Sequence, residues 1–591
     1  MNSLFLLLNL LPIIYLYKFN AYAHFSVPLG GDFTISFTQT PLGTFFAYLS
    51  LISMLLVVVA QRGKKFTFGY YLLQFLLSMA MLIIVFASNF ITFFIGWEIM
   101  TWSSYFIISK SEKIDTKSLQ KYILFSLSSA FFLLAGMVIA YSFANSFDFK
   151  TLSDAFGSIP FGIKVSIITL LSIAFFIKAG VIGLHYWVLD TYSRAPDLFS
   201  SILSAVMSKM GIYGLLLLYG NIIGYHELKS IYGTILNGTT FGYIIAWVGV
   251  ITSIIATFKA ITQDEVKRLL AYSSIAQLGY IIAVVGIGTN YAVAGALYHT
   301  LLHTVIKLLL FINVAAIISQ TGKSRFSELG GLIYKTPISF VMLLIGIIGL
   351  AGMPPLGGFA SKFMIYNATI DVKFALILIG ILFSGAASFL YCYKLVYGIY
   401  LGHPTSREIE STKEVSYSYL IPQIVLALIL ILTGAFPGAF IKVVNPVLKE
   451  FSLKSIPYDK PSIMHSAVGD FNGLFIMSAF VVIFVLILLL VLKIKSKATN
   501  SLNRFDISYC GEIPTVNTRL HYGYGFGTDL HRINFANQIL KRSSSGFYES
   551  LSTQTKKLSE LFNRAYRGNI HNTMIVILLF FSILFFIGVS Q

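Results

Sequence analysis

Long apolar runs separated by short polar connections dominate the chain. A membrane-spanning helix needs about 20 mostly apolar residues, and fifteen runs approach this length. The runs cover residues 3–17, 42–60, 70–88, 90–109, 119–142, 163–189, 198–220, 241–259, 270–288, 292–318, 336–369, 374–398, 418–436, 472–493 and 572–588. This pattern predicts an all-α polytopic membrane protein with about 15 transmembrane helices.

Two of these runs, 163–189 and 336–369, are too long for one straight helix. The second contains the segment Gly-Met-Pro-Pro-Leu-Gly-Gly at 352–358, and proline removes a helix hydrogen bond. Broken helices at membrane depth are tolerated only in the protein interior or around water. We therefore expect a broken helix in the second run and an interrupted one in the first.

The two long runs each carry one lysine, Lys178 and Lys362, and lie five spans apart. An odd number of spans makes two copies point in opposite directions, which is a common transporter plan. The spacing predicts two inverted five-helix repeats, each forming a half-channel, over 70–220 and 241–398. The remaining chain then divides into N-terminal spans 1–69, additional spans 399–493, an arm 494–571 and a C-terminal anchor span 572–591.

The arm separates two spans by far more residues than a turn requires. Its first part, to about residue 527, is rich in Gly, Tyr and Asn and is expected to be irregular. Spacings of mostly 3, 4 and 7 predict an amphipathic helix over 528–568 lying along the membrane. The apolar positions are Leu530, Ile533, Phe547, Leu551, Leu558, Leu561, Phe562 and Tyr566. The segment 543–546 (Ser-Ser-Ser-Gly) is expected to break it; the alternative is a disordered basic loop.

Composition excludes a soluble multidomain protein, because 56% of residues are hydrophobic and only 11% are charged. The net charge of +18 does not require nucleic acid, since membrane proteins concentrate Lys and Arg in cytoplasmic loops. Only two cysteines, Cys392 and Cys510, are present, and they form no CxxC motif. We expect neither an iron–sulfur cluster nor another cofactor in this chain.

Alternate connections differ strongly in basic residues. One set holds 27 Lys and Arg and the other holds 7, which predicts a cytoplasmic N-terminus and an external C-terminus. The segment 21–23 (Ala-Tyr-Ala) after the first span resembles a signal-peptidase site. The short segment before the apolar run has no Lys or Arg, so we expect the first span to be retained as an anchor.

Several titratable residues lie inside the predicted spans. A charge at the bilayer centre costs about 2.5–3.5 kcal/mol, so such a set points to pairing or function rather than to lysines that extend toward the membrane surface. The set comprises Glu98, Lys178, Lys209, Lys307 and Lys362, with His185, His299 and His303. Burial favours a neutral lysine and a nearby carboxylate favours the charged form. Glu98 could therefore switch Lys178 between holding and releasing a proton.

Three of these residues share one helix face. His299, His303 and Lys307 follow at intervals of four residues, which places them about 6 Å apart along the axis. This spacing suits a water-bridged proton relay. The alternative is that the two histidines bind zinc. The glutamate of an HExxH motif is missing, so we expect no metal.

Six stretches resemble the antiporter-like subunits of respiratory complex I. They are Phe-Ile-Gly-Trp-Glu at 94–98, the stretch 177–187, Ser-Arg-Ala-Pro at 193–196, the stretch 264–280, and 299–307 together with 352–362. The stretches 206–214 and 567–571 look more like the large antiporter-like subunit of formate hydrogenlyase and related group 4 membrane-bound hydrogenases. The match starts one helix later than the usual core, and Leu203 stands where complex I relatives often have histidine.

The resemblance implies a proton- or sodium-translocating membrane-arm subunit of a prokaryotic cell-membrane complex. Glu98 and Lys178 would form the coupled pair, Lys209 and Lys307 with the histidines the central axis, and Lys362 the exit gate. Redox centres would lie in partner subunits, including a hydrogenase or dehydrogenase module and further antiporter-like subunits. The alternatives are a sodium/proton antiporter subunit of a related cation-antiporter complex and a non-pumping membrane scaffold.

Overall fold

The computed structural model describes residues 2–18, 24–30, 33–64, 66–401, 409, 411–466, 468–493, 527–541 and 544–567. The chain divides into two compact units, Met1–Asp529 and Leu530–Gln591. The predicted final span 572–588 and most of the irregular part of the arm lie outside the described residues.

Within the described residues, twelve helices are long and apolar enough to cross a membrane. They are α2 (Pro41–Ala60), α3 (Phe68–Phe86), α4 (Phe90–Ser109), α5 (Thr116–Ala144), α7 (Phe161–Ala179), a composite helix Asp197–Ile222, α12 (Thr240–Ile261), α13 (Val266–Ile287), α14 (Asn290–Thr321), α17 (Ala375–Ile399), α19 (Tyr417–Ala435) and α21 (Gly473–Lys493). Two further apolar helices are shorter, α1 (Asn2–Lys18) and α15 (Pro337–Ala351). The all-α polytopic fold is confirmed, and the total of fifteen spans stays a prediction.

Short elements connect the spans. They are β1 (His24–Gly30), β2 (Phe33–Thr38), α6 (Phe149–Ala155), α8 (Tyr186–Arg194), α11 (Tyr225–Tyr232), β3 (Thr234–Ile235), β4 (Gly238–Thr239), α16 (Gly357–Asp371), α20 (Ala439–Glu450), β5 (Ile463–Met464) and β6 (Phe471–Asn472). The strands form three antiparallel hairpins, β1–β2, β3–β4 and β5–β6. Short 3-10 turns lie at Phe156–Ser158, Phe326–Glu328, Leu332–Tyr334 and Thr528–Arg532.

Local sequence sets where many helices begin and end. A Thr or Asn side chain before a helix accepts a hydrogen bond from one of its first free N–H groups, which is the usual N-cap. The residues that do this are Thr40, Thr67, Asn89, Thr239 and Thr289. Gly322 ends α14 with a φ of 66°, a conformation that glycine adopts without steric cost.

Both over-long runs are broken. α7 ends before Gly180 and α15 ends before Gly352, and the two glycines share a φ of 75°. The chain resumes in α8 and α16 respectively. The run 163–189 is therefore not a single span, because its last residues belong to a separate helix. The two inverted repeats stay a prediction, although the two breaks have the same backbone geometry.

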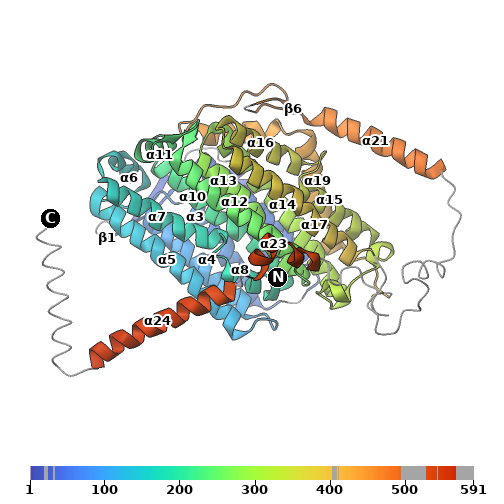
Figure 1. Cartoon of the computed structure of the whole chain (residues 1–591), viewed down its shortest axis with the longest axis horizontal. Helices are drawn as coiled ribbons and strands as arrows, with labels where there is room; N and C mark the ends of the chain where they lie inside the picture. Colours follow the sequence, from blue (N-terminus) through green and yellow to red (C-terminus); the bar gives the residue numbers. More distant parts are fainter. Residues whose placement is uncertain are drawn as a thin grey trace, which may run out of the picture. The chain divides into compact units, whose positions relative to one another are not determined.

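Three helices form the centre of the larger unit: α13, α14 and the composite helix Asp197–Ile222. In the most apolar stretch of each of these helices, 100%, 94% and 100% of the residues are buried, whereas in α21 only 6% are. Apolar residues cover these helices on all sides, as expected for helices surrounded by other helices. In Figure 1, α12, α13 and α14 lie side by side, and each packs against the next in sequence. The candidate residues lie on this central group and its neighbours.

α12 and α13 approach each other through glycines. A Cβ added at Gly249 would lie 2.4 Å from the Gly279 carbonyl oxygen, and one at Gly279 would lie 2.5 Å from the Gly249 oxygen. One further contact pairs Gly242 with Gly286, where a Cβ on Gly242 would lie 2.8 Å from the carbonyl oxygen. Small residues let membrane helices pack with their backbones in contact, so this pair leaves no room for a side chain.

One histidine binds two aspartates around the β5–β6 hairpin. The two ring nitrogens of His465 lie 2.9 Å from carboxylate oxygens of Asp459 and Asp470. Next in the chain, the Phe471 ring packs against Phe359 and Phe363 of α16, with centroids 5.5 and 5.6 Å apart. The hairpin thus contacts the helix that carries Lys362.

The second unit contains two helices, α23 (Asn534–Lys541) and α24 (Ser544–Arg567). The predicted break at 543–546 falls partly outside the described residues, which omit 542–543, and residues 544–546 are the first residues of α24. Ile533 and Phe535 are more than half exposed. The role of this arm as a structure lying along the membrane stays a prediction.

Candidate functional site

Lys178 lies in the last turn of α7, directly before the break at Gly180. Its side chain is buried, and Nζ has no hydrogen-bond partner among the described residues. The amine lies 5.8 Å from the ring centres of both Trp97 on α4 and Tyr122 on α5. Aromatic faces attract a cation without accepting its protons in normal hydrogen bonds, so this lysine has a weak and adjustable set of partners.

Glu98 stands next to Trp97 on α4 and is half-buried. One carboxylate oxygen accepts a hydrogen bond of 3.2 Å from the Trp102 indole, and the other has no partner in the described part of the chain. The charges of Glu98 and Lys178 interact, but no ion pair within 4.0 Å joins them among the described residues. The predicted pair is therefore a near neighbour pair with a gap between its charged atoms.

The break after α7 is closed by side chains of the same segment. The Trp187 indole donates to the carbonyl oxygen of Ile177 at 3.0 Å, which satisfies a group that the helix end leaves free. His185 precedes α8, is buried, and its Nδ1 accepts a bond of 3.3 Å from the Gly183 amide. His185 lies near Lys259 and the Tyr272 ring rather than in contact with the other two histidines.

Lys209 lies between two π-helical segments of the composite helix, Leu203–Met207 and Leu217–Ile222. The Lys209 amine donates to the Ser204 carbonyl oxygen, which lies in the first π segment and also accepts from the Ser208 hydroxyl, and at 3.5 Å to the Ser208 hydroxyl itself. Such π-bulges occur frequently at functional sites. Its charge reaches Lys307 across the helix interface.

His299 is held at both ring nitrogens. Nδ1 lies 3.0 Å from the Ser361 hydroxyl on α16, and Nε2 lies 3.1 Å from Oε1 of Gln277 on α13. The amide nitrogen of Gln277 in turn donates to the Tyr391 hydroxyl at 3.2 Å. Both nitrogens of His299 are thus engaged by partners on other helices.

His303 follows one turn later on α14, and its side chain is fully buried. The two imidazole rings are nearly parallel, with centroids 6.1 Å apart. Neither ring nitrogen of His303 has a hydrogen-bond partner among the described residues. The charges of Lys209, Lys307 and Lys362 all reach this ring, which places it at the centre of the set.

Lys307 lies one further turn along α14. Its amine donates to the Ser273 hydroxyl at 2.7 Å and to the Leu270 carbonyl at 3.1 Å, both on α13. The same helix supplies Ser274, whose hydroxyl lies 2.7 Å from that of Ser204 on the composite helix. Lys209 and Lys307 are therefore connected through neighbouring serines.

Lys362 lies on α16, and its side chain reaches back to the end of α15. Its amine donates to the carbonyl oxygens of Leu350 and Ala351 at 3.1 and 2.9 Å, and so caps the free end of α15. The Tyr280 ring centre lies 5.4 Å away. Gly352 fits here because a Cβ at this position would meet the Lys362 stem at 2.5 Å.

The predicted residues thus form two groups and one separate residue. The first group is Glu98 with Lys178, and His185 stands apart. The second group contains Lys307, His303 and His299 on α14, Lys362 on α16 and Lys209 on the composite helix. Among the described residues no cluster of three or more metal-ligating side chains occurs.

Several partners in the site had no role assigned from sequence. Ser273, Gln277 and Tyr280 all lie on α13 and bind or face the titratable residues, and Ser361 adds a fourth. Their polarity within a span that is buried on all sides is a signal that could have singled them out. A further buried lysine, Lys394, donates to the Ile261 carbonyl at 2.9 Å at the end of α12.

The family described as NADH:quinone oxidoreductase/Mrp antiporter, transmembrane, matches residues 87–388, which is more than half of the chain. The chain belongs to this family. The matched region contains Glu98, Lys178, both histidines of α14 and Lys362, so the predicted resemblance is confirmed.

Curated relatives include complex I and hydrogenase subunits. The chain is 28% identical over 427 residues to NADH-quinone oxidoreductase subunit N of Desulforamulus reducens, covering 70% of this chain and 85% of the relative. It is 26% identical over 422 residues to hydrogenase-4 component B of Escherichia coli, covering 65% of this chain and 60% of that protein.

Solved structures extend the similarity to nearly the whole chain. A chain of the archaeal respiratory complex called membrane-bound sulfane sulfur reductase shares 28% identity with a TM-score of 0.83, covering 99% of this chain and 94% of that one. A chain of the Mrp complex from Dietzia sp. DQ12-45-1b shares the fold with a TM-score of 0.72 at 21% identity, covering 99% of this chain and 59% of that chain. The fold also matches a chain of complex I from Thermus thermophilus, with a TM-score of 0.67, 19% identity and coverage of 76% and 95%.

Proposed function

We propose that this antiporter-like membrane subunit translocates protons through its buried lysines and histidines, within a complex whose redox chemistry takes place in partner subunits. One observation carries the proposal. Lys209, His303, Lys307 and Lys362 are all buried within the helices of the larger unit. The charges of the three lysines all act on the His303 ring. Such residues are costly in a membrane and mark ion pathways.

The geometry supports a relay with two gaps to be bridged. Lys178 and His303 each present buried nitrogen atoms without a protein partner among the described residues. Buried polar atoms nearly always have a partner, and a bridging water can replace a direct hydrogen bond. Water would therefore connect Glu98 to Lys178, and His303 to its lysine neighbours.

Lysine and histidine favour protons over sodium as the transported ion. Sodium, like other hard cations, is bound by several oxygen ligands, and Glu98 is the only carboxylate in the proposed set of eight residues. Apart from the Mrp complex, the relatives and structures named above carry the names of redox enzymes or respiratory complexes, and this chain offers no cysteine cluster. We therefore place redox centres and further antiporter-like subunits in partners, and the N-terminus in the cytoplasm with the C-terminus outside.

The decisive experiment measures acidification of vesicles that contain the purified complex, driven by its electron donor and acceptor. Lys307→Met should abolish pumping because no proton can bind there. Lys307→Arg keeps the charge but cannot release a proton under these conditions, and it should also abolish pumping. Pumping by the arginine variant at the normal rate would reduce Lys307 to a structural charge.

The same vesicles separate the alternative functions. Ion movement that requires sodium would assign the chain to the sodium/proton antiporters. A complex whose redox reaction proceeds without movement of either ion, in the unaltered protein, would identify a non-pumping scaffold.

A further inference from the structure

A pocket of about 780 Å³ opens among three connections at one end of the helices of the larger unit. It is bounded by the connections between α2 and α3, between α4 and α5, and between α8 and the composite helix Asp197–Ile222. The excess of Lys and Arg in these connections places this end on the cytoplasmic side. Its volume falls in the range of small-ligand pockets.

Three lysines line the pocket: Lys64, Lys110 and Lys113. The Lys64 amine lies over the Tyr419 ring at 5.2 Å. The Lys110 side-chain amine makes no hydrogen bond or ion pair with the part of the chain that the structure describes, although its backbone N–H donates to the Ile107 carbonyl. The Lys113 side chain is 54% exposed and reaches Asp197 only at 3.4 Å. All three amines therefore retain most of their capacity to bind an anion.

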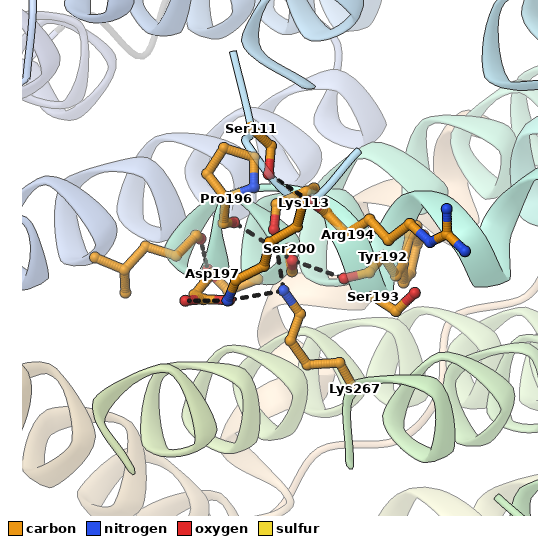
Figure 2. Close-up of polar contacts among 12 residues, drawn as sticks. Ser111, Lys113, Tyr192, Ser193, Arg194, Pro196, Asp197, Ser200 and Lys267 are labelled. Atoms are coloured by element: carbon orange, nitrogen blue, oxygen red, sulfur yellow. Dashed lines mark hydrogen bonds and ion pairs between the residues drawn. The ribbon is translucent and has the colours of Figure 1, made fainter. Parts of the chain in front are cut away.

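The nearby carboxylate Asp197 does not neutralise this group. Its principal partner is Lys267 on α13, at 2.8 Å, and the same amine also donates to the Ala195 carbonyl at 3.0 Å. Figure 2 shows the amines of Lys113 and Lys267 directed at Asp197. Because Lys267 already pairs with Asp197, the three pocket lysines and Glu112 leave a net positive charge in the pocket.

The pocket also adjoins surface that faces lipid. Phe66 and Tyr70 line it, and α3 begins between them. Along α3 the exposed apolar side chains continue with Phe68, Leu72 and Leu76, and the adjacent end of α4 exposes Trp102 and Phe106. A ligand that is both anionic and attached to hydrocarbon chains matches a basic pocket joined to an apolar helix face.

We propose that this pocket binds the phosphate headgroup of an anionic phospholipid from the cytoplasmic leaflet. Lys64, Lys110 and Lys113 bind the phosphate oxygens, while the acyl chains lie along α3 and α4. Basic pockets between membrane helices on this side of the membrane recognise such headgroups. Lys113 can leave Asp197 for the phosphate, since Lys267 continues to hold that carboxylate.

The test uses the full-length protein, purified and freed of lipid, with three added probes. These are dioleoylphosphatidylglycerol, dioleoylphosphatidylcholine with the same acyl chains, and millimolar inorganic phosphate. The amount of lipid retained per protein is measured by mass spectrometry after gel filtration. The protein should retain phosphatidylglycerol in preference to phosphatidylcholine, and inorganic phosphate should not displace it.

Substitutions locate the binding. Lys110→Gln should weaken retention of phosphatidylglycerol about fivefold, as expected for one basic residue beside an anionic lipid. The triple substitution of Lys64, Lys110 and Lys113 to Gln should remove it. The matched control changes Lys117, Lys335 and Lys413, which are exposed residues of the same predicted side, and should retain the lipid.

Three outcomes would overturn the proposal. One is equal retention of phosphatidylglycerol by the pocket variant and the control variant. A second is displacement of the lipid by inorganic phosphate, which would identify a site for a soluble anion. The third arises in the intact complex: a carbodiimide cross-link from Lys110 to a carboxylate of another subunit would show that a protein segment fills the pocket.

Discussion

The hydroxyl of Ser361 lies 3.0 Å from Nδ1 of His299 and also 3.0 Å from the carbonyl oxygen of Gly358. A hydroxyl has one proton to donate. When Nδ1 of His299 carries no proton, the Ser361 hydroxyl can donate to it. When Nδ1 carries a proton, the ring donates to Ser361, and the hydroxyl turns to Gly358. The proton on His299 therefore decides a hydrogen bond within α16, three residues from the end of the broken segment 352–358 and next to Lys362.

Ser361→Ala should slow pumping several-fold, because His299 loses one of its two partners while Lys362 stays in place. Ser361→Thr, which retains the hydroxyl, should restore most of the rate. The measurement is the initial rate of vesicle acidification per assembled complex. Ser50→Ala is the matched control, since Ser50 also donates to a carbonyl three residues earlier but lies on α2. Equal rates for the alanine variants of Ser361 and Ser50 would contradict the role.

Lys178→Ala should abolish pumping while the complex still assembles. Its amine is held only by ring faces and by the charge of Glu98, so its removal breaks no hydrogen bond among the described residues. Glu98→Gln should reduce pumping less, because Lys178 can still titrate. Lys164→Ala serves as control: Lys164 is also buried on α7, but it pairs with Glu227 at 2.7 Å. Normal pumping by Lys178→Ala would remove this lysine from the mechanism.

Single substitutions of His299 or His303 by Gln should leave partial pumping, since water can bridge one gap. The same purified variants test the rival zinc site by elemental analysis. We expect no stoichiometric zinc in the unaltered protein. Zinc present at one equivalent, and lost from either variant, would replace the relay by a metal centre.

The β5–β6 hairpin should loosen as pH rises. The hydrogen bond that His465 donates to Asp470, with a smaller contribution from the one to Asp459, raises the pKa of His465 above its ordinary value. The stabilisation is thus complete below the unfolded pKa of about 6.5 and is lost as pH passes through the higher folded value. The rate of limited proteolysis at 454–472 should therefore increase at alkaline pH.

Asp470→Asn supplies the control for this pH effect. Comparing the variant with the unaltered protein at each pH cancels the pH dependence of the protease. The difference between them should be large in acid and vanish in alkali. A difference that is constant with pH would show that the ion pair does not hold the hairpin.

Deletion of 528–591 should weaken attachment of neighbouring subunits without changing the buried lysines, which all lie in the larger unit. The amphipathic α24 carries Lys556, Lys557 and Arg564, which suit a membrane surface or an acidic partner. Native gel analysis in mild detergent compares the subunit content of the truncated and complete complexes. A truncated complex that stays whole and pumps normally would deny the arm a clamping role.

Sequence predicted the membrane fold and both broken segments because each depends on local signals. Hydrophobic length identifies spans, and Gly352 with the adjacent prolines marks the second break. The equal spacing of His299, His303 and Lys307 sufficed to place them on one face of α14. The end of α7 at Gly180 was less evident, because the residues that follow remain apolar enough to suggest a continuous span.

The partners of the site depend on contacts between distant segments, and these were not evident from sequence. Gln277 reaches His299 only because α13 and α14 pack together, and the π turn that turns Lys209 toward Ser204 has no recognised sequence signal. His185 is a different case. Its relay role stays a prediction, and packing places it beside Tyr272 and Lys259, away from the other histidines.

The glycine contact between α12 and α13 limits which parts of the molecule can move during a transport cycle. Two backbones that touch at Gly249 and Gly279 cannot slide without collision. α13 also carries Ser273, Gln277 and Tyr280, the acceptors that face Lys307, His299 and Lys362. We therefore expect these acceptors to keep their positions during transport. On this expectation, rotating lysine stems and reorienting hydroxyl groups carry the charge, against a frame that stays at rest.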